Sequence, residues 1–118
     1  MKQKISESQL QSQILQYLRY KGFLCWKNHN TGIYDPHKKY FRKIGKDLVG
    51  IPDISFIYPR KSIGGDIIGQ HGFIEVKIKP NKPSKAQDNW IQKAIENNCI
   101  AFVAYTIDDV INFIEEKE

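Results

Sequence analysis

The sequence has few cysteines and no long apolar run, and each shortage excludes a class of protein. Its 118 residues include two cysteines, Cys25 and Cys99, which have neither the spacing of a zinc site nor the number of a disulfide framework. We expect both to be buried, reduced thiols of a cytosolic protein. No uninterrupted apolar stretch approaches 18 residues, and none follows the basic residues at the start, so we expect neither a membrane span nor a secretion signal.

Internal repeats, low-complexity tracts and proline- or serine-rich linkers are also missing, so the sequence predicts a single domain over residues 1–118. A chain of this length buries about 65% of its unfolded surface on folding. We therefore expect a hydrophobic core that needs no disulfide or metal to hold it together.

Charge is present and unevenly distributed. Residues 1–61 contain 12 Lys/Arg and 4 Asp/Glu, a net charge of +8, whereas residues 62–118 contain 6 and 9, a net charge of −3. A basic half indicates a polyanionic partner, because phosphate neutralisation releases counterions and supplies most of the sequence-independent affinity for nucleic acid. Since many soluble proteins are mildly basic, charge alone does not decide the partner.

Capping residues and hydrophobic periodicity predict three helices and four strands. Helices are expected over about residues 7–21, from Ser84 to Asn97-Asn98, and after Thr106, and each begins with a capping pattern. Strands are expected at 23–26, at 54–58, around Glu75, and at 99–105, which is continuously apolar like an interior strand. The order α-β-β-β-α-β-α predicts an α/β fold, a single small mixed β-sheet flanked by helices on both faces.

Two segments are expected to lie outside these elements. Residues 29–50 are polar and basic and read as a long functional loop, with a brief strand at Tyr40 to Ile44. Residues 59–71 are rich in glycine and read as the long tip of a hairpin between the two strands that carry acidic residues.

The segments Pro52-Asp53 and Glu75-Val76-Lys77 carry the chemistry. Strand side chains alternate with a period of two, so Ile74, Val76 and Ile78 are expected on one side and Phe73, Glu75 and Lys77 on the other. Taken singly, Glu-x-Lys is often a solvated strand face and Pro-Asp a common turn dipeptide. Their order and strand contexts favour a shared site.

Adjacent strands would bring Asp53 and Glu75 together, although 22 positions separate them. Two carboxylates about 4 Å apart repel by roughly 4 kcal/mol at an effective dielectric near 20, so one must be protonated unless a cation lies between them. Mg²⁺ suits this place, because it binds hard oxygen ligands and uses only one or two protein carboxylates.

Four motifs in this order resemble the VRR-NUC family of the PD-(D/E)XK nuclease superfamily. They are Glu7, Gly50-Ile51-Pro52-Asp53, Glu75-Val76-Lys77 and Ser84-Lys85-Ala86-Gln87. The resemblance implies a restriction-endonuclease-like core and a divalent-metal-dependent hydrolase of DNA phosphodiester bonds. It implies that Asp53, Glu75 and the carbonyl of Val76 bind Mg²⁺ or Mn²⁺ and that Lys77 assists the attacking water.

Glu7 and Gln87 each have two interpretations. Glu7 is either a further metal ligand, directly or through water, or an acid that complements the dipole of the first helix. Gln87 either closes the capping box with Ser84 or points its amide toward Lys77 or a phosphate. The resemblance favours the functional interpretation of both residues.

Basic residues supply the candidate DNA contacts. The resemblance suggests Lys27 and Asn28, while Lys79 and Lys85 continue from Lys77 into the next helix. In the long loop, basic residues alternate with aromatic ones, a mixture suited to phosphate contacts and base stacking: Lys38, Lys39, Arg42 and Lys43. The alternative for Lys79 and Lys85 is an ordinary solvated surface, and for the loop residues it is a charged loop with buried aromatic anchors.

Stand-alone members of the family resemble phage or bacterial Holliday junction resolvases. The resemblance therefore implies branched DNA as substrate, a homodimer, and the cytosol of a bacterium or a phage-infected cell. Two alternatives stay open, a non-catalytic nucleic-acid-binding module on the nuclease scaffold and a sequence-specific restriction-type endonuclease.

Overall fold

The computed structural model describes residues 4–28, 33–35, 40–42 and 48–118. Its elements, in chain order, are α1 Glu7–Tyr20, β1 Cys25–Lys27, β2 Ile33–Asp35, β3 Tyr40–Arg42, β4 Ile54–Lys61, β5 Ile67–Val76, α2 Lys85–Glu96, β6 Ile100–Ala104 and α3 Ile107–Lys117. Apart from the small β2–β3 hairpin, this is the predicted order α-β-β-β-α-β-α.

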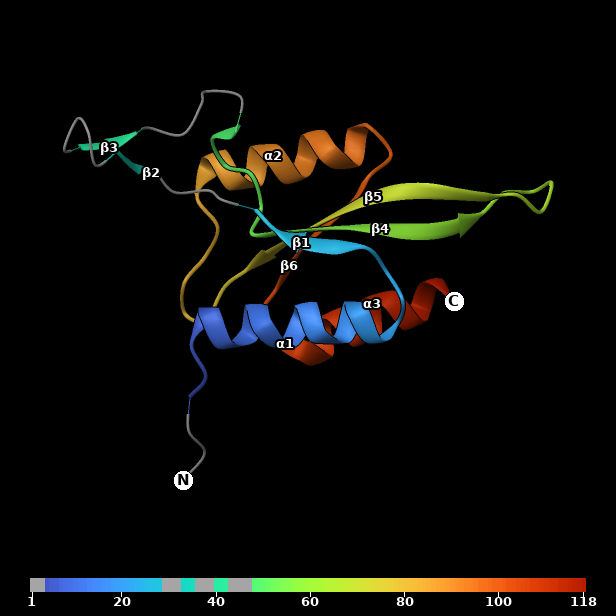
Figure 1. The fold of residues 1–118 in the computed structure, drawn as a ribbon, viewed down its shortest axis with the longest axis horizontal. Coiled ribbons are helices and arrows are strands. Elements are labelled where there is room, and N and C mark those ends of the chain that lie inside the picture. Colours follow the sequence, from blue (N-terminus) through green and yellow to red (C-terminus); the bar gives the residue numbers. More distant parts are fainter. Residues whose placement is uncertain (1–3, 29–32, 36–39, 43–47) are drawn as a thin grey trace.

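The four main strands form one mixed sheet in the order β1-β4-β5-β6. β4 is antiparallel to β1 and β5, whereas β6 runs parallel to β5. Helices α1 and α3 cover one face of the sheet and α2 covers the other (Figure 1). The predicted α/β fold with helices on both faces is therefore confirmed.

The core lies between the sheet and the pair α1 and α3. Each helix begins with the capping box expected from its sequence, which satisfies backbone N–H groups of the first turn. The fully buried apolar side chains include Leu10, Ile14 and Leu18 of α1, Ile54 and Phe56 of β4, Ile74 and Val76 of β5, and Val110 and Ile114 of α3. The predicted separation of Ile74 and Val76 from Glu75 is confirmed, because both isoleucine and valine point into this core.

The interior position predicted for the strand at 99–105 is wrong. Within the described residues β6 is an edge strand of the main sheet. Its side chains are apolar on both faces because α2 packs on one face and α3 on the other. A continuous apolar run therefore indicates that both faces of a strand are covered. It does not indicate that the strand has a neighbour on each side.

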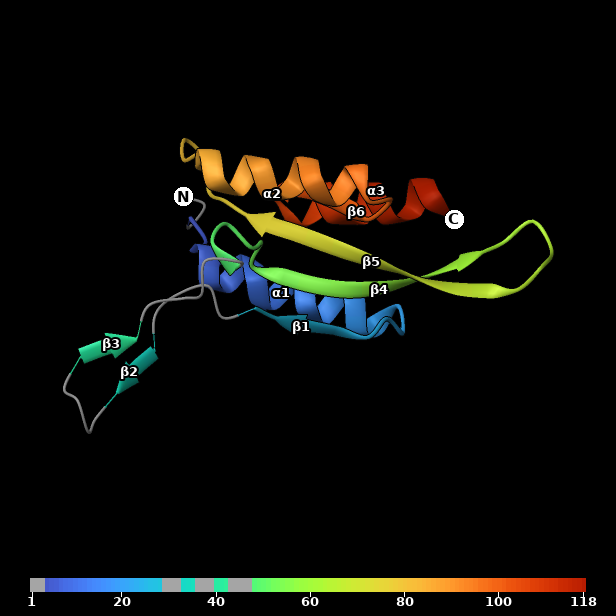
Figure 2. The same cartoon turned by 90° about the horizontal axis from the view of Figure 1, so that it is seen from above.

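The hairpin predicted between the two strands that carry acidic residues is confirmed, but most of residues 59–71, expected outside the strands, belongs to them. β4 continues to Lys61 and β5 begins at Ile67, and Pro59 pairs with Gly69 in the ladder. The result is a long two-stranded arm that extends past the helices (Figure 2). Cross-strand pairing overrides the weak strand preference of proline and glycine, which is a context-dependent preference.

None of the helices in the described ranges is long and apolar enough to cross a membrane.

Candidate active site

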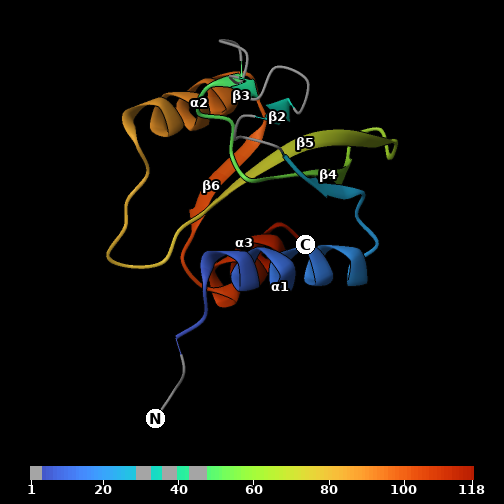
Figure 3. The same ribbon diagram turned by 60° about the vertical axis from the view of Figure 1, so that its left-hand side comes forward.

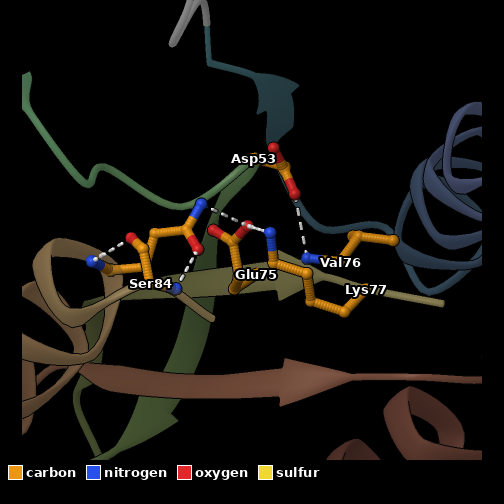
Figure 4. A network of polar contacts seen from close by, with 6 residues as sticks. Asp53, Glu75, Val76, Lys77 and Ser84 are labelled. Atoms are coloured by element: carbon orange, nitrogen blue, oxygen red, sulfur yellow. Dashed lines mark hydrogen bonds and ion pairs between the residues drawn. The ribbon is translucent and has the colours of Figure 1, made fainter. Parts of the chain in front are cut away.

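Asp53 and Glu75 come together at one end of the two central strands. Asp53 directly precedes β4, and Glu75 is the penultimate residue of β5. Because Ile54 pairs with Ile74 in the antiparallel register, the residue before Ile54 and the residue after Ile74 bring the two acids side by side. Figure 4 shows Asp53 above Glu75, with Lys77 reaching toward the same point.

The end of the β4 ladder explains how Asp53 is held. The pairing of β4 with β5 stops at Ile54, so the N–H of Val76 has no ladder partner on that side. It donates instead to Oδ2 of Asp53 over 2.9 Å. Asp53 is 7% exposed, so a buried main-chain donor fixes a buried carboxylate.

Glu75 is more deeply buried, with 1% of its surface exposed. Its Oε1 accepts a hydrogen bond from Nε2 of Gln87 over 3.1 Å and lies 3.7 Å from Nζ of Lys77. Its Oε2 is buried and has no hydrogen-bond donor among the described residues. Oε2 can share a hydrogen bond with the Asp53 carboxyl only if one of the two acids is protonated.

This environment raises the pKa of Glu75 to about 8. The largest cause is burial, followed by the charge of Asp53 and a hydrogen bond with it, and the ammonium of Lys77 only partly offsets them. At neutral pH the metal-free pair therefore holds a proton. A cation between the carboxylates would replace that proton.

Gln87 closes the capping box of α2, and its amide contacts a partner other than the expected Lys77 or phosphate. Its Oε1 accepts from the N–H of Ser84 over 2.8 Å, which closes the capping box of α2. Its Nε2 donates to Glu75, so the expected contact with Lys77 or a phosphate is here a contact with the carboxylate. One amide thus ties the start of α2 to the end of β5.

Gly50 allows α2 to approach the loop that carries Asp53. Its φ is +85°, and a Cβ at this position would collide with the backbone carbonyl of Ala86 in the first turn of α2. Only glycine adopts this backbone conformation without strain and leaves that space empty. The Gly50-Ile51-Pro52-Asp53 segment therefore lies close to Gln87.

Asn28 holds the same loop from the other side. Its Nδ2 donates to the carbonyl of Pro52 over 3.0 Å and to Oγ of Ser55 over 2.8 Å. Its backbone N–H donates to the carbonyl of Asp53 over 2.7 Å, and its Oδ1 accepts from Nε1 of Trp26 over 3.1 Å. The sequence analysis missed this role, for which the only signal is an asparagine directly after a strand. DNA contact by Asn28 stays a prediction.

Glu7 lies partly buried in the first turn of α1. Its charge contributes to the raised pKa of Glu75, which places the two carboxyl groups within electrostatic reach of each other. Gln11, one turn further along the same face, is 8% exposed, and its Oε1 has no partner among the described residues. The sequence analysis did not select Gln11, although its position four residues after Glu7 was the available signal.

The candidate DNA contacts are spread more widely. Lys27, Lys79 and Lys85 are exposed. Lys38, Lys39 and Lys43 lie outside the described residues, as does the side chain of Arg42, whose backbone belongs to β3. DNA contact by all of these residues stays a prediction.

The donor set fits a hard divalent cation. Within the described ranges, no three or more His, Cys, Asp or Glu side chains form a group that could hold a metal ion. Two carboxylates and a main-chain carbonyl at Val76 nevertheless match Mg²⁺, which takes its remaining ligands from water and phosphate oxygens. The donorless Oε2 of Glu75 is the atom that such a cation would satisfy.

Comparison with known proteins supports the fold. No model of a protein family and no curated protein matches the sequence. A solved structure described as "VRR_NUC domain" matches 95% of this chain and 97% of its own, with a TM-score of 0.64 and 22% identity. At this identity the similarity establishes the fold alone. The fold is that of a VRR_NUC domain over nearly the whole chain.

Proposed function

We propose that this chain is a single-domain, divalent-metal-dependent DNA endonuclease of the VRR-NUC family. The observation that carries the proposal is the convergence of Asp53 and Glu75, both buried, beside Lys77. Buried acids placed side by side destabilise a protein unless they are protonated or bind a cation. Their placement side by side at the end of two strands is therefore best explained by a function.

Each side chain has a defined part in this proposal. Asp53 and Glu75 would hold Mg²⁺ or Mn²⁺ together with the carbonyl of Val76, and Glu7 would add a ligand directly or through water. When bound, the cation neutralises the carboxylates and the substrate phosphate and makes a coordinated water more acidic. The N–H of Val76 orients Asp53, and the amide of Gln87 orients Glu75. Lys77 supplies positive charge where negative charge grows on the phosphate.

The finer parts of the proposal concern substrate, assembly and place of action. We propose branched DNA, such as a Holliday junction, as substrate, and the cytosol of a bacterium or a phage-infected cell as the location. One chain carries one candidate site, so symmetric cleavage of two strands requires two protomers, and a two-fold dimer is the commonest assembly. Light scattering with and without junction DNA tests the dimer.

The central experiment is cleavage of a labelled four-way junction with Mg²⁺, with Mn²⁺ and with EDTA, beside a gel shift. We expect metal-dependent cleavage by the wild type, none by Asp53→Asn, and reduced cleavage by Lys77→Ala. Lys93→Ala, which removes an exposed lysine from α2, is the matched control and should cleave normally. Metal titration by calorimetry should show binding to the wild type and its loss in Asp53→Asn.

The same experiment separates the alternatives. Binding to the junction without cleavage in any metal would favour the non-catalytic module. Equal cleavage of linear duplex at a fixed sequence would favour a restriction-type enzyme. Wild-type turnover by Asp53→Asn would reject the assignment of the site.

A further inference from the structure

A cleft lies directly beyond the ends of β5 and β6. Its volume is about 350 Å³, and it is formed by the segment before α1, the segment after β5 and the start of α3. Figure 3 shows these three segments next to one another where β5 and β6 end. Its lining includes Ile5, Ile78, Ile107 and Tyr105, with Lys4 and Lys79 among the same residues.

The cleft adjoins the candidate active site through the backbone. The N–H of Lys77 donates to the carbonyl of Ala104 over 3.1 Å, which joins the ends of the two parallel strands. Lys79 follows Lys77 by two residues, a reach of roughly 7 Å at most. Tyr105 directly follows Ala104. Along the chain, the lining residues Lys79 and Tyr105 therefore lie within two residues of Lys77 and of its hydrogen-bond partner Ala104.

Its chemistry combines an apolar surface with positive charge. Nζ of Lys79 lies 5.6 Å from the centroid of the Tyr105 ring. A neighbouring cleft shares both of these residues and adds Lys82. Among the residues that the structure describes, no acidic side chain lines either cleft, and the nearby Oδ2 of Asp109 accepts hydrogen bonds from the N–H groups of Tyr105 and Thr106.

Contacts with phosphate groups alone would not require the apolar lining of the cleft. Lysines on an ordinary surface suffice to bind a DNA backbone, whereas an aromatic ring and isoleucines favour a flat, apolar group. The faces of a paired base are covered by its neighbours in the duplex. Only an unpaired base can place a face against Tyr105.

We propose that this cleft binds an unpaired nucleotide of the DNA substrate next to the cleaved bond. Tyr105 and the isoleucines receive the base, while Lys4 and Lys79 contact its phosphate. A volume of about 350 Å³ lies within the range of small-molecule sites, roughly 300–1,000 Å³. The proposal rests on the nuclease function above and deepens it, because it specifies a substrate with unpaired nucleotides at the branch.

The test pairs an abasic scan of the DNA with a change of Tyr105. Each nucleotide within three positions of the cut in a labelled branched substrate is replaced in turn by an abasic residue. Affinity is measured in EDTA and the cleavage rate in Mg²⁺. Tyr105→Leu removes the ring, Tyr105→Phe keeps it, and Tyr20→Leu alters an exposed tyrosine at the far end of α1 as matched control.

We expect one abasic position to weaken wild-type binding roughly 10-fold, the effect of losing one stacked base. That penalty should persist in Tyr105→Phe and Tyr20→Leu and shrink to less than about threefold in Tyr105→Leu. The proposal would be overturned if no abasic position weakened binding, or if the penalty were equal in the wild type and Tyr105→Leu. A cleft that binds a protein partner predicts that no abasic position weakens binding.

The two readouts separate this proposal from the nuclease function. Coupling between the base and Tyr105 in EDTA without any metal-dependent cleavage would support the cleft and reject the nuclease. Cleavage by the wild type without coupling would support the nuclease and reject the cleft.

Discussion

At the scale of single residues, the two buried carboxylates set the chemical character of the molecule. Removing two like charges from water is unfavourable, and Glu75 responds with a pKa raised to about 8 by burial and by Asp53. In the metal-free protein at neutral pH, the Asp53–Glu75 pair therefore carries a proton. Binding of a divalent cation must release that proton, so metal affinity should rise with pH.

This proton makes the stability of the metal-free protein depend on pH. Glu75 titrates near its ordinary value of 4.5 in the unfolded chain and near 8 in the folded protein. Between these values the folded state binds more protons, so this group lowers stability as pH rises, by up to about 1.4 kcal/mol per pH unit. Glu75→Gln removes this titration. In EDTA the unfolding free energy of the variant minus that of the wild type should therefore increase from pH 5 to pH 8.

Urea unfolding of both proteins at pH 5, 6.5 and 8 checks this prediction. Addition of Mn²⁺ at pH 8 should stabilise the wild type and leave Glu75→Gln almost unchanged. Parallel pH profiles for the two proteins would mean that Glu75 is not protonated in the folded state.

Asn28 is the residue whose side chain holds the Asp53 loop in place. Asn28→Ala leaves partly buried groups of Pro52 and Ser55 without this partner and removes an exposed hydrogen bond from Trp26, so we expect a loss of about 1–3 kcal/mol in unfolding free energy. Lys27→Ala, one residue earlier and exposed, should stay within about 0.5 kcal/mol of the wild type. Equal effects of the two changes in chemical denaturation would contradict the role given to Asn28.

At the scale of elements, the site depends on the approach of α2 to the loop before β4. Gln87 reaches Glu75 only because the start of α2 lies against Gly50. The close approach therefore links a glycine in a loop to the orientation of a carboxylate in a strand.

Gly50→Ala should therefore lower the unfolding free energy by more than the backbone strain alone would. Gly65→Ala is the matched control, since Gly65 has a similar φ of +90° but nothing within 4 Å of its added Cβ. We expect Gly65→Ala to cost about 1–2 kcal/mol, and Gly50→Ala to cost a further 1–3 kcal/mol, roughly, because of the collision with Ala86. Thermal unfolding measures both, and equal losses would show that α2 does not need this approach.

At the scale of the whole molecule, charge is divided between the two halves of the chain. The excess of +8 in residues 1–61 includes the basic residues between β1 and β4 in the sequence. A polyanion bound by this half would make many exposed contacts that salt weakens.

The salt dependence of DNA binding tests whether the loop takes part. Replacing Lys38, Lys39, Arg42 and Lys43 together by glutamine should lower the slope of log affinity against log salt by up to about 0.9 per lost phosphate contact on duplex DNA. Replacing Lys93 and Lys117 of α2 and α3 should leave the slope unchanged. A quadruple variant with the wild-type slope in fluorescence titrations in EDTA would place the DNA on another surface.

The sequence by itself determined the three helices and the side of β5 on which Glu75 lies. Capping boxes at Ser6, Ser84 and Thr106 located the helices, because the groups that close them lie within three residues. The period of two around Glu75 separated the acid from the core side chains. These patterns are local, so they can be recognised without knowing how the chain folds back on itself.

Only the tertiary structure decided which groups meet. The edge position of β6, the continuation of the β4–β5 arm, the hold of Asn28 on the Asp53 loop and the protonation of Glu75 all depend on residues far apart in the chain. Local patterns report which faces are buried and where turns form, but strand neighbours, pairing register and the field at a carboxylate come from contacts that the packed chain alone creates.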